Sequence, residues 1–383
     1  MKIISSLFIF CCFLFSTRFS FAQYKVTFLV KQPSVLHKND HLFIAGSFNG
    51  WDPGDKEFEI DTTKNGITVL LSQGHYEFKF TRGSWQKVET TSDGKGISNR
   101  VLKVFHDTTV TIQINGWSDN FDQAVSPEKV HTASANVKVI DTAFFIPQLN
   151  RTRRIWVYLP PDYINTKNYY PVLYMHDGQN LFDNATSYSG EWGIDEYLDS
   201  IYPLRKKEVI VVGIDNGLSK RMNEYNPYTF KQYGKGEGDA YVDFLVNSLK
   251  PFIDKNYRTL PNKTNTYIAG SSMGGLISFY AVLKYPAVFG GAGIFSPAFW
   301  TAPDIDGLVI SKTKKINARL FFYAGCKEGD SMIPDMKKIE KEIKVNIASP
   351  LHEIIDADAK HNEDAWRKYF PAFYEWAIVG RER

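Results

Sequence analysis

The stretch TYIAGSSMGGL, residues 266–276, decides how this chain folds. Its apolar start TYIA predicts a buried strand, and the apolar-periodic residues 276–283 predict a helix. The turn GSSMG between them forces a serine into a strained, exposed conformation, while its glycines let neighbouring backbone approach without a Cβ clash. The G-x-S-x-G frame selects Ser272 over Ser271 as the candidate nucleophile. The alternative is a glycine-rich turn with an incidental serine.

The strand and helix around Ser272 belong to a longer alternation that starts near residue 136. Apolar runs of strand length are separated by helical stretches, which is typical of a parallel sheet covered by helices on both faces. We therefore predict an α/β domain over residues 136–383. The runs expected to form its strands are residues 155–159, 172–175, 209–214, 266–269, 320–324 and 352–355.

The first part of the chain follows a different pattern. Between residues 24 and 117, short runs of alternating apolar and polar residues are punctuated by Gly, Asn and Asp. Strands of that length and spacing predict a small antiparallel, immunoglobulin-like sandwich over residues 23–117. Residues 118–135 are polar, have no sustained period and form the predicted linker.

Residues 1–22 resemble a secretory signal peptide. Lys2 precedes an apolar stretch of about 13 residues, and Ser20 and Ala22 are small residues placed for cleavage. The stretch is shorter than the roughly 20 residues that span a bilayer, so a membrane anchor is the less favoured interpretation. We expect the mature chain to begin near Gln23 and to be secreted or periplasmic.

Composition narrows the functional classes. The 383 residues are 43% hydrophobic and 23% charged, which suits a folded globular protein of about two domains. The formal net charge of +3 includes two basic residues of the predicted signal peptide, so no broad basic field for nucleic acid is expected. Beyond that peptide the sequence has a single cysteine, Cys326, which cannot form a disulfide within its own chain.

A serine hydroxyl is a poor nucleophile until a base removes its proton, so a histidine is expected downstream of Ser272. The sequence offers two candidates there. His352 stands inside an apolar strand, whereas His361 follows that strand in a loop and is the better base. The alternative for His361 is a solvated loop histidine.

The carboxylate that orients this histidine is expected after the strand at residues 320–324. In folds with this serine turn the chain order is serine, acid, histidine. Glu328 is our first choice and Asp330 our second, because a loop of unknown shape can present either one. The carboxylate would hold the imidazole tautomer and stabilise the imidazolium without itself being protonated.

Two backbone N–H groups are expected to stabilise the oxyanion that forms when Ser272 attacks a carbonyl. The helix after the serine supplies the N–H of Met273. In the segment HDGQNLFD, Gly178 permits a sharp turn that aims the N–H of Gln179 inward. Met273 and Gln179 are therefore the predicted oxyanion donors.

The segment HDGQNLFD admits a rival interpretation as a metal site. His176, Asp177 and Asp183 carry suitable ligand atoms. No further cluster of His, Cys or acidic residues completes such a site, so we expect no metal. Acyl transfer through a serine also needs no cofactor.

Six segments of residues 140–380 carry a family likeness: RRIWVYLPPDY, YPVLYMHDGQNLFD, GEWGIDE, IAGSSMGGL, FYAGCKEGD and KHNEDAW. By these segments the region resembles the esterases of the α/β-hydrolase fold that include carbohydrate esterase family one (feruloyl and acetylxylan esterases), the enterochelin-type siderophore esterases and the mycolyltransferases. The segments are spread over the whole second part of the chain and are specific to the family. The resemblance implies Ser272 as nucleophile, His361 as base, Glu328 as acid, and Met273 and Gln179 as oxyanion donors. It does not fix the acyl group.

Residues 24–117 contain the runs LFIAGSFNGWDP and YEFKFTRGSW. By these runs the region resembles the glycogen-binding-type (family 48-like) carbohydrate modules and the early-set domains that precede starch-active enzymes. The resemblance implies that Trp51 and Trp85 stack on sugar rings, with Lys79 and Asn99 as polar partners; a flat indole suits the C–H face of a pyranose. The alternative is a purely structural GSFNGW turn with Trp51 packed inward.

Substrate-binding residues are harder to assign in the second part of the chain. Trp192 and Trp300 lie in loops after predicted strands, where open parallel sheets bind their ligands, but packing in the core is an equally plain interpretation. Arg221, Glu224 and Tyr225 in SKRMNEYNP are expected to brace the site rather than to touch substrate.

The sequence therefore predicts a secreted serine carboxyl-ester hydrolase with an N-terminal β-sandwich. The favoured substrate is a feruloyl or acetyl ester on a plant polysaccharide, because a domain that resembles a sugar module precedes the esterase. A siderophore triester is the enzymatic alternative. A sugar-binding protein with a catalytically silent hydrolase domain is the alternative from a different class.

Overall fold

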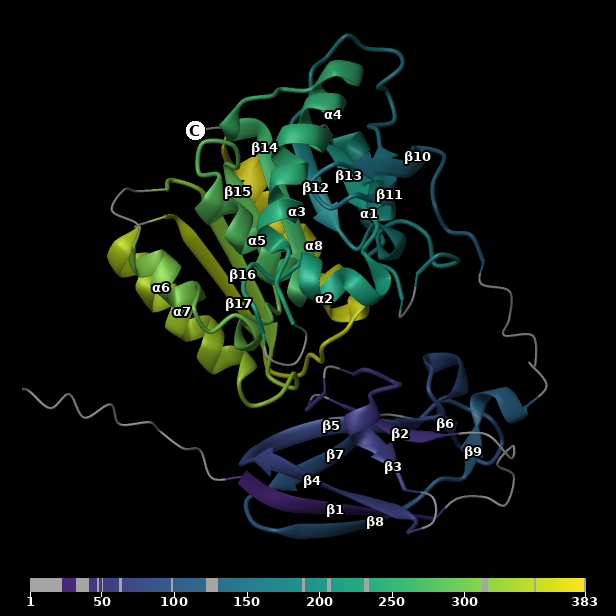
Figure 1. The fold of residues 1–383 in the computed structure, drawn as a ribbon. Coiled ribbons are helices and arrows are strands. Elements are labelled where there is room, and N and C mark those ends of the chain that lie inside the picture. Colours follow the sequence, from purple (N-terminus) through teal and green to yellow (C-terminus); the bar gives the residue numbers. More distant parts are fainter. Residues whose placement is uncertain are drawn as a thin grey trace, which may run out of the picture. The chain divides into compact units, whose positions relative to one another are not determined.

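A computed structural model gives the fold (Figure 1). It describes residues 23–31, 41–46, 48–49, 51–61, 64–97, 99–121, 130–187, 190–204, 208–230, 234–311, 316–347 and 349–381. The predicted signal peptide, residues 1–22, lies outside the described residues. The chain divides into two compact units, Met1–Ala124 and Val125–Arg383. Within the described ranges, none of the helices combines the length and the apolar character that crossing a membrane requires.

The first unit is a β domain whose two larger sheets share one apolar core. Val26 and Phe28 of one sheet and Ile44, Phe78 and Phe80 of the other belong to the same buried cluster. One sheet has the order β4-β1-β8, the second β3-β2-β5-β7, and a small third sheet pairs β6 with β9. The strands are β1 (Gln23–Lys31), β2 (Leu42–Gly46), β3 (Glu59–Ile60), β4 (Gly66–Ser72), β5 (Gly74–Thr81), β6 (Glu89–Thr90), β7 (Arg100–Val104), β8 (Thr108–Gln113) and β9 (Gly116–Trp117).

One strand pair of this unit corrects the sequence prediction. A wholly antiparallel sandwich is wrong, because β1 and β8 run parallel, with Val26 opposite Thr108 and Lys31 opposite Gln113. Alternation of apolar and polar residues tells which strand face is buried, but it carries no information on strand direction. The other pairs of the two larger sheets are antiparallel.

The second unit is built on an eight-stranded sheet with the order β10-β11-β13-β12-β14-β15-β16-β17. From β13 to β17 all neighbours pair in parallel, and β10 and β11 add an antiparallel edge. The predicted α/β sheet is thus confirmed. Its strands are β10 (Val137–Ile146), β11 (Arg151–Tyr158), β12 (Val172–His176), β13 (Ile210–Ile214), β14 (Thr266–Ser271), β15 (Gly291–Phe295), β16 (Arg319–Gly325) and β17 (Leu351–Asp356).

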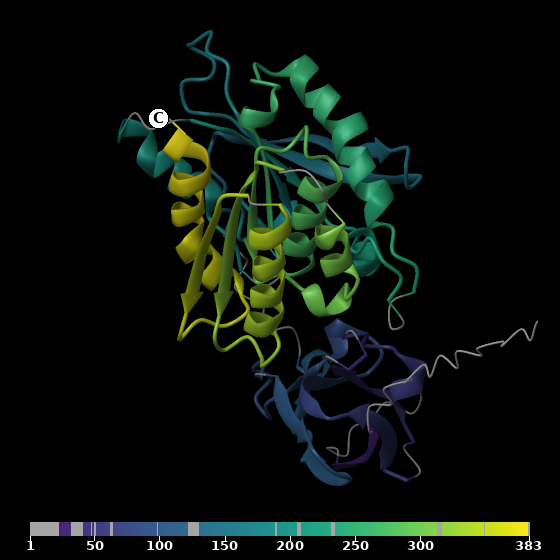
Figure 2. The ribbon, with the colours of Figure 1, turned by 90° about the vertical axis from the view of Figure 1, so that its left-hand side faces the viewer.

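Helices cover both faces of this sheet (Figure 1 and Figure 2). Side chains of a strand alternate between the faces, so Tyr174 packs into one buried cluster while Leu173 and Met175 pack into the other. The first face carries α3 (Gly238–Phe244), α4 (Lys250–Asn256), α5 (Met273–Lys284), α6 (Ile305–Ile310) and α7 (Met332–Asn346). The second carries α1 (Ile194–Ile201) and α8 (Glu363–Phe373). A short helix, α2 (Arg221–Glu224), follows β13.

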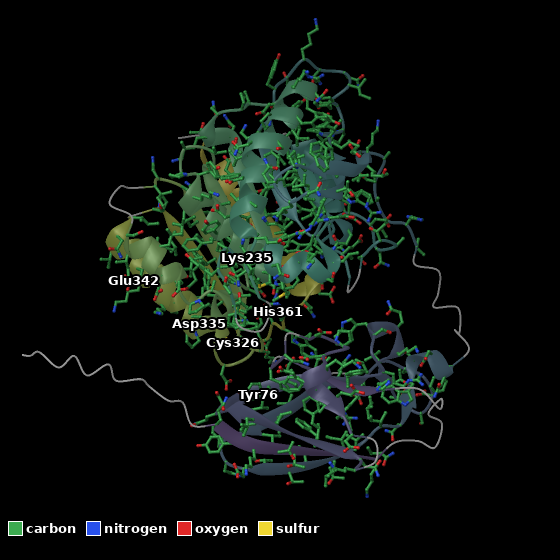
Figure 3. The ribbon with its side chains drawn as sticks, in the orientation of Figure 1. Tyr76, Lys235, Cys326, Asp335, Glu342 and His361 are labelled. Atoms are coloured by element: carbon green, nitrogen blue, oxygen red, sulfur yellow. The ribbon has the colours of Figure 1, made fainter. Side chains whose placement is uncertain are left out.

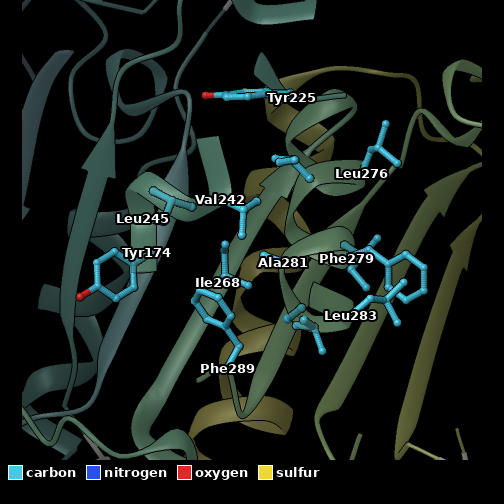
Figure 4. Close-up of a cluster of buried hydrophobic side chains, with 14 of the residues drawn as sticks. Tyr174, Tyr225, Val242, Leu245, Ile268, Leu276, Phe279, Ala281, Leu283 and Phe289 are labelled. Carbon is cyan, nitrogen blue, oxygen red and sulfur yellow. The ribbon is translucent and has the colours of Figure 1, made fainter. Parts of the chain in front are cut away.

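Helix α5 is held almost wholly inside the first face. Leu276, Phe279 and Leu283 are fully buried in the same cluster as Ile268 of β14 (Figure 4). Full burial of one such side chain contributes roughly 1.5–3 kcal/mol, so the axis of α5 is tightly fixed on the sheet. The residue at the start of this helix is therefore presented from a rigid support.

The two ends of the predicted linker are each bonded within their own unit. Asp119 pairs with Arg82 in the first unit. In the second unit, Thr132 Oγ1 donates to Glu191 Oε2 (2.7 Å) and the N–H of Ser134 donates to Asp195 Oδ2 (2.7 Å). The middle of the predicted linker, residues 122–129, lies outside the described residues.

Candidate active site

Ser272 stands on the tight turn between β14 and α5. Its backbone has φ 58° and ψ −120°, a region that costs an ordinary residue roughly 1–3 kcal/mol. The turn is held by bonds on both sides, because the N–H of Ser272 donates to Phe295 O (2.9 Å) and Ser272 O accepts from the N–H of Leu276 (3.1 Å). A Cβ at Gly270 would lie 2.9 Å from the backbone of Gly274, so the two residues can approach this closely only because residue 270 is glycine.

The Ser272 hydroxyl is placed at the N-terminus of α5. The side chain is half-buried, and its Oγ has no hydrogen-bond partner within the described part of the chain. The N–H of Met273, the first residue of the helix, is likewise unbonded there. Free N–H groups and the positive end of a helix dipole favour a negative charge at this point.

The side chains of Glu328 and His361 meet on the loops after β16 and β17. His361 Nδ1 lies 2.8 Å from Glu328 Oε2. Two backbone bonds join these loops, from Cys326 N to Asp356 O (2.8 Å) and from Lys327 N to Ala359 O (3.0 Å). His361 and Cys326 are labelled there in Figure 3. The structure thus brings the first-choice acid, and not Asp330, onto the predicted base.

The Glu328 carboxylate is completely enclosed, and both of its oxygens have hydrogen-bond donors. Its side chain is 0% exposed. Oε1 accepts from the N–H of Gly325 (2.6 Å) and from Ser296 Oγ (2.9 Å), and Ser296 Oγ accepts in turn from Trp366 Nε1 (2.9 Å). These donors fix the orientation of the carboxylate.

The His361 ring remains accessible. Its side chain is 36% exposed, and the ring meets Trp366 edge-on with centroids 5.0 Å apart. Because an ionised carboxylate only accepts hydrogen bonds, the Nδ1 of His361 must carry the proton that faces Glu328. Nε2 is then unprotonated in the neutral ring and able to accept a proton.

The other downstream histidine lies elsewhere. His352, in β17, is stacked between Phe321 and Trp376, with ring centroids 5.5 Å from each. Its ring is packed against the aromatic side chains of the second face rather than against the serine turn. Of the two histidines, His361 is therefore the one on the acid loop.

The loop after β12 lies next to the serine turn, because β12 and β14 are neighbours in the sheet. Asp177 adopts a left-handed conformation with φ 56°, and a Cβ at Gly178 would lie 2.9 Å from the backbone N of Asp215. Among the described residues, the N–H of Gln179 has no acceptor. The turn therefore depends on glycine at 178 and leaves an N–H available.

The three residues of the rival metal interpretation point to separate partners. His176 Nδ1 lies 3.0 Å from Tyr241 OH, Asp177 is paired with Arg221, and Asp183 with His131. Burial lowers the pKa of His176 to about 3, so its ring is neutral. Across the described residues there is no group of three His, Cys, Asp or Glu side chains that could hold a metal ion.

The two tryptophans predicted to bind substrate have different surroundings. Trp192 is 3% exposed; its ring stacks on Trp366 (5.8 Å) and meets Phe295 edge-on (5.0 Å). It lies in the core cluster, which leaves little surface for a substrate. Trp300 is 39% exposed and meets Phe230 edge-on (5.8 Å). Of this pair, Trp300 has the accessible ring.

In the first unit, Trp51 and Trp85 form a half-buried pair with ring centroids 6.2 Å apart. The turn before Trp51 is built around Asn49, whose side chain accepts from the N–H of Gly46 and donates to Ile44 O, each at 2.8 Å. Trp51 is thus not sealed in the core.

Lys79 and Asn99, the two polar residues of the carbohydrate prediction, are both located by strand β5. Lys79 and Glu77 share one face of this strand, two residues apart, and Asn99 Nδ2 donates to Glu77 Oε2 (2.9 Å). Lys79 stands opposite Ala45 of β2. Lys79 and Asn99 therefore lie toward the same face of the sheet.

Two residues of the site were not predicted from the sequence. Ser296, in the loop after β15, donates to the acid, and Trp366, in α8, donates to Ser296. No sequence motif predicts the hydrogen bond between Trp366 and Ser296, which are 70 residues apart. Ser296 has a left-handed backbone, φ 44°. The sequence FSPAFW does not predict this conformation, because serine rarely adopts it.

Several proteins are similar to this chain. A Bacillus subtilis protein called uncharacterized protein YbbA is 29% identical over 248 residues, 60% of this chain and 94% of that protein. An endo-1,4-beta-xylanase/feruloyl esterase of Xylanibacter ruminicola is 27% identical over 218 residues, 55% of this chain and 27% of that protein. An alpha-amylase of Niallia circulans is 37% identical over 99 residues, 24% of this chain and 8% of that protein. This chain therefore spans only a small part of the latter two.

The second unit also has a likeness among solved structures. Siderophore hydrolase EstB from Aspergillus nidulans aligns with a TM-score of 0.50 and 15% identity, over 66% of this chain and 97% of that one. At this identity the match shows a shared fold. The model of the family described as "Putative esterase" matches residues 146–372, which include β11 to β17 and the residues of the serine turn and the acid loop. The chain therefore belongs to this esterase family and is a carboxylic ester hydrolase.

Proposed function

We propose that Ser272, His361 and Glu328 form the catalytic triad of this esterase. The single observation that carries the proposal is the 2.8 Å bond between Glu328 and His361, on the loops that follow two strands of the sheet bearing Ser272. A buried, fully hydrogen-bonded carboxylate orients the imidazole and stabilises its protonated form. The strained serine on the turn before α5 supplies the nucleophile.

The reaction proceeds through an acyl-enzyme. Ser272 Oγ attacks the ester carbonyl while His361 Nε2 accepts the serine proton, and the tetrahedral oxyanion is held by the N–H groups of Met273 and Gln179. Collapse breaks the ester C–O bond, and His361 returns the proton to the departing alcohol. Water, deprotonated by His361, then attacks the acyl-enzyme and releases the acid and Ser272.

We infer that the substrate is a feruloyl or acetyl ester on a plant polysaccharide. The relative from Xylanibacter ruminicola is named as both a xylanase and a feruloyl esterase. The exposed Trp300 offers an aromatic surface for a planar acyl group. The fold match to a siderophore hydrolase does not favour a siderophore, because at 15% identity it reports the fold alone.

We propose that the chain is secreted or periplasmic and that residues 1–22 are its signal peptide. The basic residue Lys2, the apolar stretch and the small residues Ser20 and Ala22 support this assignment. A polymeric substrate is consistent with an enzyme that acts outside the cell.

We further propose that the N-terminal unit is an immunoglobulin-like carbohydrate module. Two observations support it: the half-buried rings of Trp51 and Trp85 lie side by side, and a relative that matches 99 residues of this chain is an alpha-amylase. Lys79 and Asn99 lie toward one face of the sheet and would hydrogen-bond sugar hydroxyls.

The substrate proposal predicts a ranking of kcat/KM. Methyl ferulate and acetylated xylan should each be cleaved at least about tenfold more efficiently than an iron-free catecholate triester; a tenfold ratio corresponds to about 1.4 kcal/mol of transition-state discrimination. Product release is measured by chromatography under identical conditions. Preference for the triester would reject the polysaccharide ester and favour a siderophore substrate.

The carbohydrate proposal predicts a loss of affinity. In the full chain carrying Ser272→Ala, replacing Trp85 by alanine should weaken binding to soluble starch or xylan at least about fivefold, because one stacking surface is lost. Affinity electrophoresis measures the retardation. Phe105→Ala is the matched control, since it removes an exposed aromatic ring of the same unit away from the tryptophan pair. Equal retardation of both variants and the parent would contradict a role for this pair.

A further inference from the structure

A buried ion pair joins α2 to the loop that carries Gln179. Arg221 Nε donates to Asp177 Oδ1 (2.7 Å) and Nη2 donates to Asp177 Oδ2 (2.8 Å), so the guanidinium binds the carboxylate in a bidentate manner. The Asp177 side chain is 8% exposed. Such two-pronged pairs fix geometry as well as charge. Asp177 immediately precedes Gly178 and Gln179, and its orientation therefore sets the direction of the loop.

The same pair also touches the serine turn. A Cβ at Gly274, in the first turn of α5, would lie 3.4 Å from Asp177 Oδ2, and Arg221 Nη2 lies 3.5 Å from Ser271 O. The carboxylate and guanidinium are thus packed between the backbone before Ser272 and the backbone before Gln179. Any change in this packing alters the distance between the serine turn and the loop that carries Gln179.

Additional bonds hold Asp177 in its left-handed conformation. Asn216 Nδ2 donates to Asp177 Oδ1 (2.8 Å), and the N–H of Asn216 donates to Gln179 Oε1 (3.2 Å). The N–H of Asp177 lies 3.4 Å from Tyr225 OH. Asn216 therefore ties Asp177 to the side chain of Gln179, whereas Arg221 provides the positive charge.

Electrostatics gives Arg221 a role beyond packing. A bare Asp177 carboxylate beside the first turn of α5 would repel the negative charge that develops on the ester oxygen. With Arg221 in place the pair is neutral, and the dipoles of the N–H groups act on the oxyanion unopposed.

We propose that Arg221 is a positioning residue for the oxyanion hole, acting through Asp177 to set the distance between the N–H groups of Gln179 and Met273. The inference rests on the proposed function of Ser272, His361 and Glu328. Arg221 acts on the transition state without touching substrate, so its loss should appear in kcat rather than in KM.

The test compares Arg221→Met with the parent enzyme on p-nitrophenyl acetate. We expect kcat to fall roughly 10²- to 10³-fold, the range for loss of one oxyanion donor, with KM changed less than about threefold. Affinity for a trifluoromethyl ketone, which forms a tetrahedral adduct with the serine, should fall in parallel with kcat. The pH at which kcat/KM reaches half of its plateau should stay in place, because the Glu328 and His361 pair is intact.

Arg153→Met is the matched control. Arg153 is paired with the fully buried Glu224, which belongs to the same short helix, and it makes no hydrogen bond to Asp177. Both variants remove an arginine from an ion pair with α2 and should destabilise the fold; Arg151 still pairs with Glu224 in the control. The control should keep kcat within about threefold of the parent. If Arg221→Met and Arg153→Met lower kcat equally, or if Arg221→Met leaves kcat unchanged, the positioning role is wrong.

Arg221→Lys keeps the experiment decisive if Arg221→Met does not fold. Lysine retains the charge but cannot form the bidentate hydrogen bonds, so kcat should fall at least about tenfold at unchanged KM. Full activity of this variant overturns the inference. Failure of the proposed function looks different: Ser272→Ala would then be as active as the parent, whatever the Arg221 variants do.

Discussion

Replacing Ser272 by alanine is expected to lower kcat for p-nitrophenyl acetate by roughly 10⁶-fold, the scale seen when a triad nucleophile is removed. The alanine variant keeps the turn but has no oxygen to form the acyl-enzyme. Folding should not suffer, because Oγ makes no hydrogen bond within the described residues. Release of p-nitrophenol in a stopped assay measures the rate, and thermal unfolding confirms that the variant is folded.

Ser271→Ala is the control for this experiment. Ser271 is the adjacent serine in GSSMG and is 5% exposed at the end of β14. Its loss should leave kcat within about tenfold of the parent, because its hydroxyl is not on the strained turn. If the parent and Ser272→Ala release p-nitrophenol at equal rates, Ser272 is not the nucleophile. If Ser271→Ala is the inactive variant, the nucleophile has been assigned to the wrong serine.

Glu328→Gln should lower kcat by roughly 10²- to 10⁴-fold. A glutamine has one acceptor oxygen where the carboxylate has two, yet Gly325, Ser296 and His361 all present donors to this group. The amide NH₂ group therefore faces the N–H of His361, donor against donor. The least costly rearrangement moves the ring proton from Nδ1 to Nε2, and Nε2 can then no longer accept the serine proton. kcat on the same acetate ester measures the loss.

Asp330→Asn is the companion variant, since Asp330 follows two residues later on an exposed part of the same loop. Its kcat should stay within about threefold of the parent. A larger loss from Asp330→Asn than from Glu328→Gln would transfer the role of the acid to Asp330. Equal, small losses from both would mean that His361 is oriented by neither.

The order of motifs along the chain is enough to nominate Ser272, His361 and Glu328 as candidate site residues. GSSMG predicts a serine turn between a strand and a helix, and the position of His361 after a strand distinguishes it from His352. These features are local, because turns and strands leave their marks within a few residues. The structure brings Glu328 and His361 together at 2.8 Å.

Other parts of the fold depend on contacts between distant segments. β15, with the sequence GAGIF, is missing from the predicted strands because glycine has low strand propensity, although burial on both sides stabilises it. β10 is also missing, since several of its side chains face solvent and its residues do not form an apolar run. The direction of β8 relative to β1, the hydrogen bond from Ser296 to Glu328 and the hydrogen bond from Trp366 to Ser296 arise only when the chain is folded.

The backbone angle at position 272 has a consequence for how this protein can change over time. A φ of 58° and a ψ of −120° suit glycine far better than serine. A glycine there would relieve the strain and raise the melting temperature, so selection for stability and selection for turnover pull this position in opposite directions. If Ser272 is the nucleophile, a descendant with glycine at 272 would keep the fold and gain stability but could no longer form an acyl-enzyme.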